Sequence, residues 1–225
     1  MKKKYLLAAV LVFSMVFVIS CSKPEEVFLK KYFNAVQMQD KDTMAAMAVE
    51  PVSFAKPFTF KVKTIGELQE GETEFAEAVK KYQEITKKLE DLKPQVLDTN
   101  DELEAAKADL AKVRSFRKKK ELKKKVEELQ KKKDGLFNQY KELQKEKQAA
   151  KEHLDAVVTI IKKSLGERVE LENANIKKQF KDVIITVNSA SGAKDFKVIF
   201  VRYLLDLGNR TQNGRWIIFK FEPLS

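Results

Sequence analysis

The sequence predicts a mixed α+β protein in which a small domain of helices and strands is interrupted by a long antiparallel α-helical hairpin. Three observations predict this fold class. Near both ends of the chain, hydrophobic residues alternate with polar ones, as in half-buried strands. Between these ends, residues 66–166 repeat hydrophobic residues every three or four positions, as in a coiled coil. If both ends of this segment join one sheet domain, the chain must return to where it left, and a hairpin allows this.

The composition narrows the class of protein before any motif is considered. The chain has 225 residues, with 44 Lys or Arg and 33 Asp or Glu, and a formal net charge of +11. With 44% hydrophobic and 34% charged residues, it is typical of neither a disordered tail nor a multi-span membrane protein. One Cys and one His exclude a disulfide framework, a Cys-based structural zinc site and the two-His metal sites. We expect no metal and no cofactor.

The N-terminus has the features of a secretion signal. Three lysines precede an apolar run over residues 6–19, which is too short to span a membrane comfortably. The segment Val18-Ile19-Ser20-Cys21 resembles the lipobox of bacterial lipoproteins. That resemblance implies a signal peptide over 1–20, cleavage between Ser20 and Cys21, and lipid on the Cys21 thiol. An uncleaved membrane anchor is the alternative.

Lipidation would anchor the protein to a membrane and so determine its cellular compartment. Cleavage removes three lysines and lowers the formal charge of residues 21–225 to +8. Several acyl chains, at about 0.8 kcal/mol per buried CH₂, anchor a protein stably. Ser22 stands where an aspartate would resemble the retention signal of many Gram-negative lipoproteins. The resemblance therefore implies the periplasmic face of the outer membrane, or the outer face of the plasma membrane in a single-membrane bacterium, with 21–24 as a lipidated linker.

Residues 25–65 are expected to form the first part of the α+β domain. Apolar residues at helical spacing predict one helix that starts at Pro24, where the missing N–H of proline costs nothing. Asp40 and Asp42 place negative charge at the start of a second helix. Alternating apolar and polar residues over 58–63 then predict a strand.

Residues 167–225 are expected to form the second part, an antiparallel meander. Apolar residues alternate over 183–187, a longer strand follows over 196–207, and a last strand covers 216–221. A Ser/Gly-rich turn and a Gly/Asn-rich turn over 208–214 separate them. The N-terminal helices can cover the apolar face of such a meander.

Together the two ends resemble the NTF2-like (cystatin-type α+β cone) lipoproteins. The helical opening over 24–44 is similar to that family, and Gly214-Arg215-Trp216-Ile217-Ile218 is close to the Gly-x-Trp-x-Ile of its last strand. The match covers about 25–63 and 176–222. The resemblance implies a cone in which Trp216 belongs to the core or lines a pocket. It transfers no catalytic residue, because the Asp/His sets of the enzymatic members have no counterpart.

The helical segment between these ends carries two apolar seams. One runs from Phe75 to Val113 and the other from Leu122 to Ile161. Nine residues separate Val113 from Leu122, where seven would preserve the heptad register. The change of phase predicts a turn near 114–121.

Charge favours pairing of the two arms. Residues 66–111 hold 13 acidic and 6 basic side chains, and residues 112–151 hold 16 basic and 6 acidic ones. Two arms of opposite charge favour an antiparallel hairpin on the order of 60 Å long. Pro94, with Thr99 and Glu102 as a capping box, predicts a kink or break in the first arm. A parallel homodimer zipper is the alternative, although we favour a monomeric hairpin.

A dense basic cluster lies at the expected turn. It can bind lipid head groups, an anionic cell-wall polymer or an acidic protein patch, or it can be a solvated helix face. Nucleic acid is not an expected partner, because the signal sends the chain out of the cytoplasm. The cluster, here called the basic tip, consists of Arg114, Arg117, Lys118, Lys119, Lys120, Lys123, Lys124 and Lys125.

The sequence offers no catalytic constellation. The motifs G-x-S-x-G, P-loop and H-E-x-x-H are absent. Glu167, Glu170 and Glu172 have no identifiable partner base or nucleophile. His153 lies beside the seam residue Leu154 and is expected to be exposed or partly packed.

We therefore expect a non-enzymatic, lipid-anchored cell-envelope protein whose coiled-coil hairpin acts as a scaffold or interaction arm through the basic tip. One alternative is a module that binds a small apolar ligand or peptide in the cone pocket. Another is an adaptor for a transport complex, although lipoyl-type barrel halves beside the coil are missing.

Overall fold

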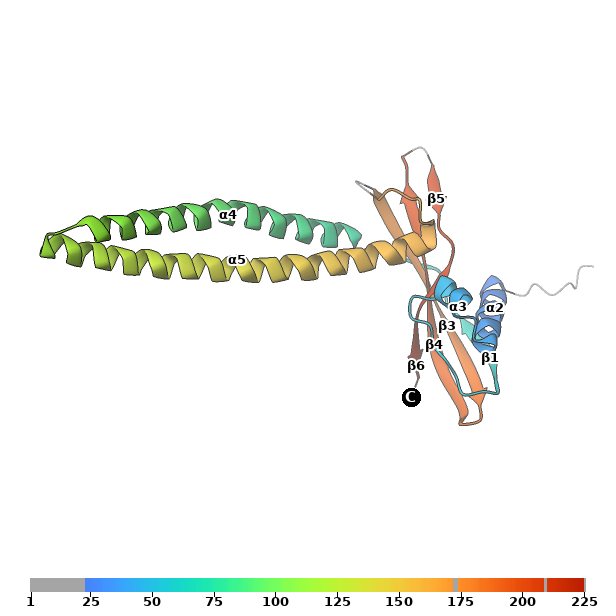
Figure 1. Cartoon of the computed structure of the whole chain (residues 1–225). Helices are drawn as coiled ribbons and strands as arrows, with labels where there is room; N and C mark the ends of the chain where they lie inside the picture. The colour runs from blue at the N-terminus through green and yellow to red at the C-terminus, as the bar shows by residue number, and fades with distance from the viewer. Residues whose placement is uncertain (1–22, 172–173, 209, 225) are drawn as a thin grey trace, which may run out of the picture. The chain divides into compact units, whose positions relative to one another are not determined.

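The computed structural model describes residues 23–171, 174–208 and 210–224. The predicted signal peptide over 1–20, its cleavage site at Ser20 and the lipidation site Cys21 lie outside these residues. The mixed α+β class is confirmed (Figure 1). The elements are α2 (Pro24–Met38), α3 (Lys41–Met47), β1 (Phe58–Ile65), β2 (Gln69–Gly71), α4 (Phe75–Lys112), α5 (Phe116–Leu165), β3 (Asn175–Ser189), β4 (Gly192–Asp206), β5 (Thr211–Asn213) and β6 (Ile217–Pro223).

The chain divides into two compact units. In the described part, the first unit comprises residues 23–70, 179–202 and 215–224. The second unit comprises residues 71–178 and 203–214, and it contains both long helices.

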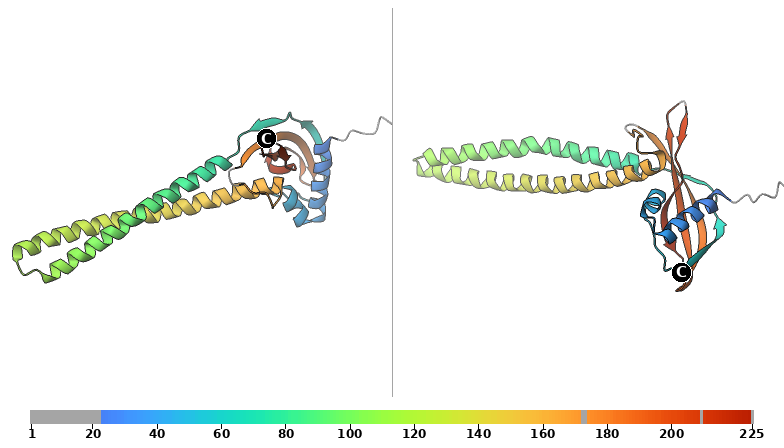
Figure 2. Two further views of the ribbon diagram at one scale, coloured as in Figure 1. Left: turned by 90° about the horizontal axis from the view of Figure 1, so that it is seen from above. Right: turned by 45° about the vertical axis from the view of Figure 1, so that its right-hand side comes forward.

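The strands form one curled antiparallel sheet (Figure 2). β3 lies between β1 and β4, and β2 also pairs with β3. β4 is long enough to pair with β6 near its start, where Phe200 is opposite Ile218, and with β5 near its end, where Leu205 is opposite Gln212. The strands β3, β4 and β6 are the three strands of the predicted meander.

The prediction of one continuous turn over 208–214 is wrong, because residues 211–213 form β5. The backbone of these polar residues pairs with Leu204–Asp206 of β4. A three-residue polar strand has no hydrophobic alternation, so only the neighbouring strand reveals it.

In the first unit, α2 and α3 pack on the sheet. α2 begins with Pro24 at its first position, and Gln39 ends it in a left-handed conformation with φ 59°. Asp40 caps α3, because its carboxylate accepts a hydrogen bond from the backbone N–H of Thr43 (3.0 Å). The buried face of α2 meets the inward side chains of the sheet in a core that includes Leu29, Tyr32, Phe33, Val36, Val183, Ile185, Val198, Phe200 and Ile218.

In the second unit, α4 and α5 pack side by side in opposite directions (Figures 1 and 2). Residues 113–115 connect them, so the turn is shorter than the predicted 114–121 and starts one residue earlier. Leu103 and Ala106 of α4 pack against Leu129 of α5 in the seam. At about 1.5 Å per residue, the 38 residues of α4 extend ~57 Å.

Of the predicted kink or break at Pro94, the break is wrong. α4 continues through Pro94 to Lys112, and Thr99 lies inside this helix with 2% of its surface exposed. Thr99 therefore does not cap a new helix with Glu102. Proline removes one backbone hydrogen bond, but seam residues on both sides of it, Leu92 and Leu103, are buried and hold the helix in place.

The described residues include no helix that combines the length and the apolar character needed to cross a bilayer.

Candidate functional site

The basic tip occupies the end of the hairpin. Arg114 lies in the connection between the helices, and the other seven residues lie in the first three turns of α5. All eight side chains are exposed. The structure thus brings together every residue that the sequence predicted for this cluster.

The electrostatics of the basic tip oppose the stability of the helix that carries it. The N-terminus of a helix has a partial positive charge and favours acidic side chains, but the first turn of α5 contains none. Arg117 forms an ion pair with Glu121 at 3.6 Å (Nε to Oε1), on a fully solvated surface. Such an exposed pair contributes little, so the positive charges of the tip remain available to an outside partner.

Phe116 is a tip residue that the sequence analysis did not include. It is the first residue of α5, and 86% of its surface is exposed. The sequence contained one signal of its exposure, because Phe116 belongs to neither apolar seam. Its place at the end of the hairpin, however, follows only from the short turn.

A second candidate site is a cleft in the first unit that contains Trp216. Its volume is about 440 Å³, and Trp216 is half-buried in its wall. The cleft lies between α2, α3 and the sheet, and Phe28 contacts Phe200 edge to face (5.5 Å between ring centroids). Its lining consists of Pro24, Glu25, Phe28, Lys31, Met47, Phe200, Arg215 and Trp216.

Two cations lie over the ring of Trp216. The Lys181 ammonium is 5.5 Å from the ring centroid, and the Arg202 guanidinium is 4.8 Å from it. Lys181 also donates to the Glu25 carboxylate at 2.6 Å. Burial alone would raise the pKa of Glu25, but the hydrogen bond and the charge of Lys181 outweigh burial and hold this pKa below its usual value. The Arg202 Nε–H in turn donates to the Gln179 side-chain oxygen (2.7 Å).

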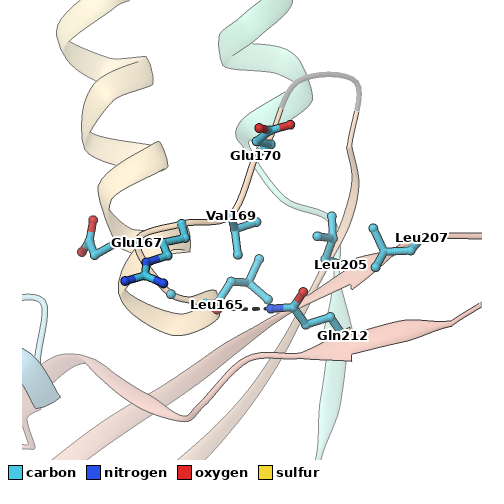
Figure 3. Close-up of a pocket in the computed structure, with 9 residues that line it drawn as sticks. Leu165, Glu167, Val169, Glu170, Leu205, Leu207 and Gln212 are labelled. Carbon is cyan, nitrogen blue, oxygen red and sulfur yellow. Dashed lines mark hydrogen bonds between the residues drawn. The ribbon is translucent and has the colours of Figure 1, made fainter.

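A third cavity, of about 660 Å³, lies in the second unit after the end of α5 (Figure 3). Leu165, Val169 and Leu205 give it apolar walls, and the Gln212 side-chain amide donates to the carbonyl of Leu165 (3.3 Å). Glu167 and Glu170 belong to its lining, which has no His, Cys, Ser or Lys in the described part of the chain. The third carboxylate of the predicted set, Glu172, lies outside the described residues.

Among the described residues, none of the three sites has a nucleophile paired with a base. His153 is exposed on α5, and among the described residues no group of three or more His, Cys, Asp or Glu could hold a metal ion. The arrangement of side chains fits binding by charge at the tip and by apolar contact in the cleft.

Comparison with known protein families, with curated proteins and with solved structures finds no match to this chain.

Proposed function

We propose that this protein is a non-enzymatic, lipid-anchored component of the bacterial cell envelope, which uses its helical hairpin as an interaction arm and the basic tip as the contact surface. The observation that carries the proposal is the concentration of eight exposed cationic side chains at one end of a paired two-helix arm. Because the first turn of α5 would be more stable with acidic residues, these cations favour a role outside the hairpin.

The membrane anchor in this proposal is Cys21, and the compartment is the periplasmic face of the outer membrane or the outer face of a single membrane. Support comes from the signal-like N-terminus and its lipobox-like segment. Metabolic labelling with an alkyne fatty acid should label the chain and should fail on Cys21→Ser. Labelling that persists in Cys21→Ser would contradict the anchor.

We also infer that the helices and the sheet of the first unit are an NTF2-like cone and that the hairpin is an insertion in it. Helices α2 and α3 packed on a curled antiparallel sheet are consistent with this, and the hairpin lies between β2 and β3 along the chain.

The contact at the tip is tested by photocrosslinking in cells. A photoreactive amino acid replaces Lys119, and the adducts are identified by mass spectrometry. We expect adducts to an envelope component, and we expect the charge reversals Lys118→Glu and Lys120→Glu to reduce their yield. A yield no higher than the background without irradiation would contradict the proposed function.

A second candidate function is the binding of a small apolar or peptide ligand in the Trp216 cleft. Three large apolar side chains, Phe28, Phe200 and Trp216, support it. Because Trp216 is the single tryptophan of the chain, its fluorescence reports on this cleft alone. Titration with an anilinonaphthalene sulfonate probe should transfer energy from Trp216, and Phe28→Ala should weaken that binding. Unchanged Trp216 emission at saturating probe would reject this function.

A further inference from the structure

We propose that the basic tip docks on a lipid bilayer rich in anionic head groups and that Phe116 enters the boundary between head groups and acyl chains. This inference rests on the proposed function, because it names the partner of the same surface. It follows from the charge, the exposed aromatic ring and the shape of the hairpin end.

The charge at the hairpin end is one-sided. Residues 109–125 contain nine basic and two acidic side chains, a net charge of +7. The Arg117–Glu121 contact is the one ion pair among the described residues of this stretch. Basic clusters of this density bind anionic lipid through long-range attraction that falls off within about a Debye length of ~10 Å.

Phe116 gives the hairpin end an apolar point within this charge. Its side chain is 86% exposed, whereas Phe137 on the same helix is 45% exposed and has the Lys141 ammonium 4.4 Å from its ring centroid. Aromatic rings beside lysines are typical of segments that lie in the interfacial layer of a membrane.

The residue types favour a bilayer over a folded protein as the partner. The basic tip has six lysines and two arginines. Protein interfaces are depleted in lysine and enriched in arginine, because the guanidinium forms paired hydrogen bonds in a fixed geometry. A stable protein interface also buries about 800 Å² on each partner, and the end of a two-helix hairpin is narrow and convex. Mobile ammonium groups suit a fluid array of phosphates.

The test uses the full chain reconstituted into neutral phosphatidylcholine vesicles, to which dye-labelled phosphatidylglycerol vesicles are added. Tethering of the two vesicle populations is measured by two-colour fluorescence coincidence. Neutral anchoring vesicles remove any competition from their own head groups. We expect tethering to anionic vesicles, none to dye-labelled neutral vesicles, and a decrease as salt rises from 50 to about 300 mM.

Matched variants locate the contact on the hairpin. Lys118→Glu, Lys119→Glu and Lys120→Glu together should reduce tethering by about tenfold or more. The same reversal at Lys131, Lys132 and Lys151, which are all exposed, should change it less than twofold, because these residues lie about 20 Å or more further along α5. Phe116→Ala should weaken tethering by about threefold to tenfold, and Phe137→Ala should leave it unchanged. Circular dichroism confirms that each variant retains its helices.

Several results would overturn the inference. One is equal loss of tethering in the two triple variants, which would show a general charge effect. Another is a Phe116→Ala variant that tethers as well as the unchanged chain. Adducts to protein alone in the Lys119 crosslinking experiment would also overturn it while leaving the interaction arm intact. A chain that does not stay on the neutral vesicles contradicts the anchor, and docking is then measured by flotation with the anionic vesicles.

Discussion

The core of the first unit and the seam of the hairpin differ in how completely they enclose their side chains. In the first unit, two helices and a sheet surround Phe33, whose ring stacks on Phe60 with 4.4 Å between centroids. In the hairpin, two helices alone face each other along Leu103, Ala106 and Leu129. Because a two-helix seam has no third layer, the buried side chains of α4 and α5 are mostly Leu, Ile, Val and Ala, whereas the core of the first unit also holds several buried aromatic rings.

This difference shows how an arm of this length remains a paired structure without a large core. The seam tolerates polar residues: Lys147 lies in it and places its ammonium 5.5 Å from the ring of Tyr82. The alkyl part of such a lysine adds apolar contact while its charge stays in water. The first unit therefore depends on a few large side chains, and the hairpin depends on the repetition of small contacts.

The largest effect should come from Phe33→Ala. Removal of this fully buried ring should lower the free energy of unfolding by about 3–5 kcal/mol, because the cavity is enclosed on all sides. Urea unfolding followed by the fluorescence of Trp216, which belongs to the same unit, measures the change. Val27→Ala on the exposed face of α2 is the control and should cost less than about 0.5 kcal/mol. Equal losses of unfolding free energy in Phe33→Ala and Val27→Ala would contradict the description of an enclosed core in the first unit.

Leu103→Ala should have the next largest effect, about 2–3 kcal/mol. Leu103 is fully buried, but the neighbouring helix can move into the space that it leaves. Far-ultraviolet circular dichroism suits this variant, because α4 and α5 contain 38 and 50 residues whereas α2 and α3 contain 15 and 7. Leu97→Ala, on the exposed side of α4, is the matched control. A loss of unfolding free energy larger than that of Phe33→Ala would contradict the claim that the two-helix seam encloses its side chains less completely than the core of the first unit.

Tyr203, near the end of β4 in the second unit, makes the free energy of unfolding depend on pH. Burial and the nearby charge of Glu74 raise the pKa of its phenol to about 12. Between pH 10 and 12 the unfolded chain releases this proton and the folded chain keeps it, so stability falls as pH rises through this range. Tyr203→Phe should remove about 2 kcal/mol of that alkaline loss. Urea unfolding at pH 8, 10 and 11.5 measures the slope, and an unchanged slope in the variant would contradict the assignment.

The smallest effect should be a gain in stability from Gly135→Ala. Gly135 lies inside α5 with open space around its α-carbon, so alanine should stabilise the helix by about 0.5–1 kcal/mol. The same substitution at Gly214 should have the opposite sign, because its Cβ would lie 2.7 Å from the carbonyl oxygen of Tyr203. Thermal unfolding followed by circular dichroism should therefore show a higher midpoint for Gly135→Ala and a lower midpoint for Gly214→Ala than for the unchanged chain. A destabilised Gly135→Ala would show that the arm is packed more tightly than described.

Local patterns in the sequence were sufficient to predict most of the elements. Helical spacing predicted α2, and the acidic residues Asp40 and Asp42 helped to predict α3. Alternation predicted β1 and β3, apolar runs predicted β4 and β6, and the loss of heptad phase predicted a turn between the long helices. The failures share one cause. β2, β5 and the helix through Pro94 depend on neighbours that are distant along the chain, and a local rule contains no information about them.

For the same reason, the sequence predicted the basic tip more completely than the Trp216 cleft. The basic tip is one run of sequence, so composition alone identified its charged members. The Trp216 cleft combines side chains from α2, α3, β4 and the segment just before β6, and only the fold brings Phe28 and Phe200 to Trp216. The exposure of Phe116 required the exact residue at which α5 begins.

The most direct test of the interaction arm compares crosslinking yields along α5 in intact cells. A photoreactive residue is placed in turn at Lys119 in the basic tip, and at Lys132 and Lys145 on exposed positions further along the same helix. We expect adducts from position 119 and a yield at background level from the other two. Equal yields at all three positions, or adducts from 132 and 145 alone, would contradict the claim that the hairpin acts through its tip.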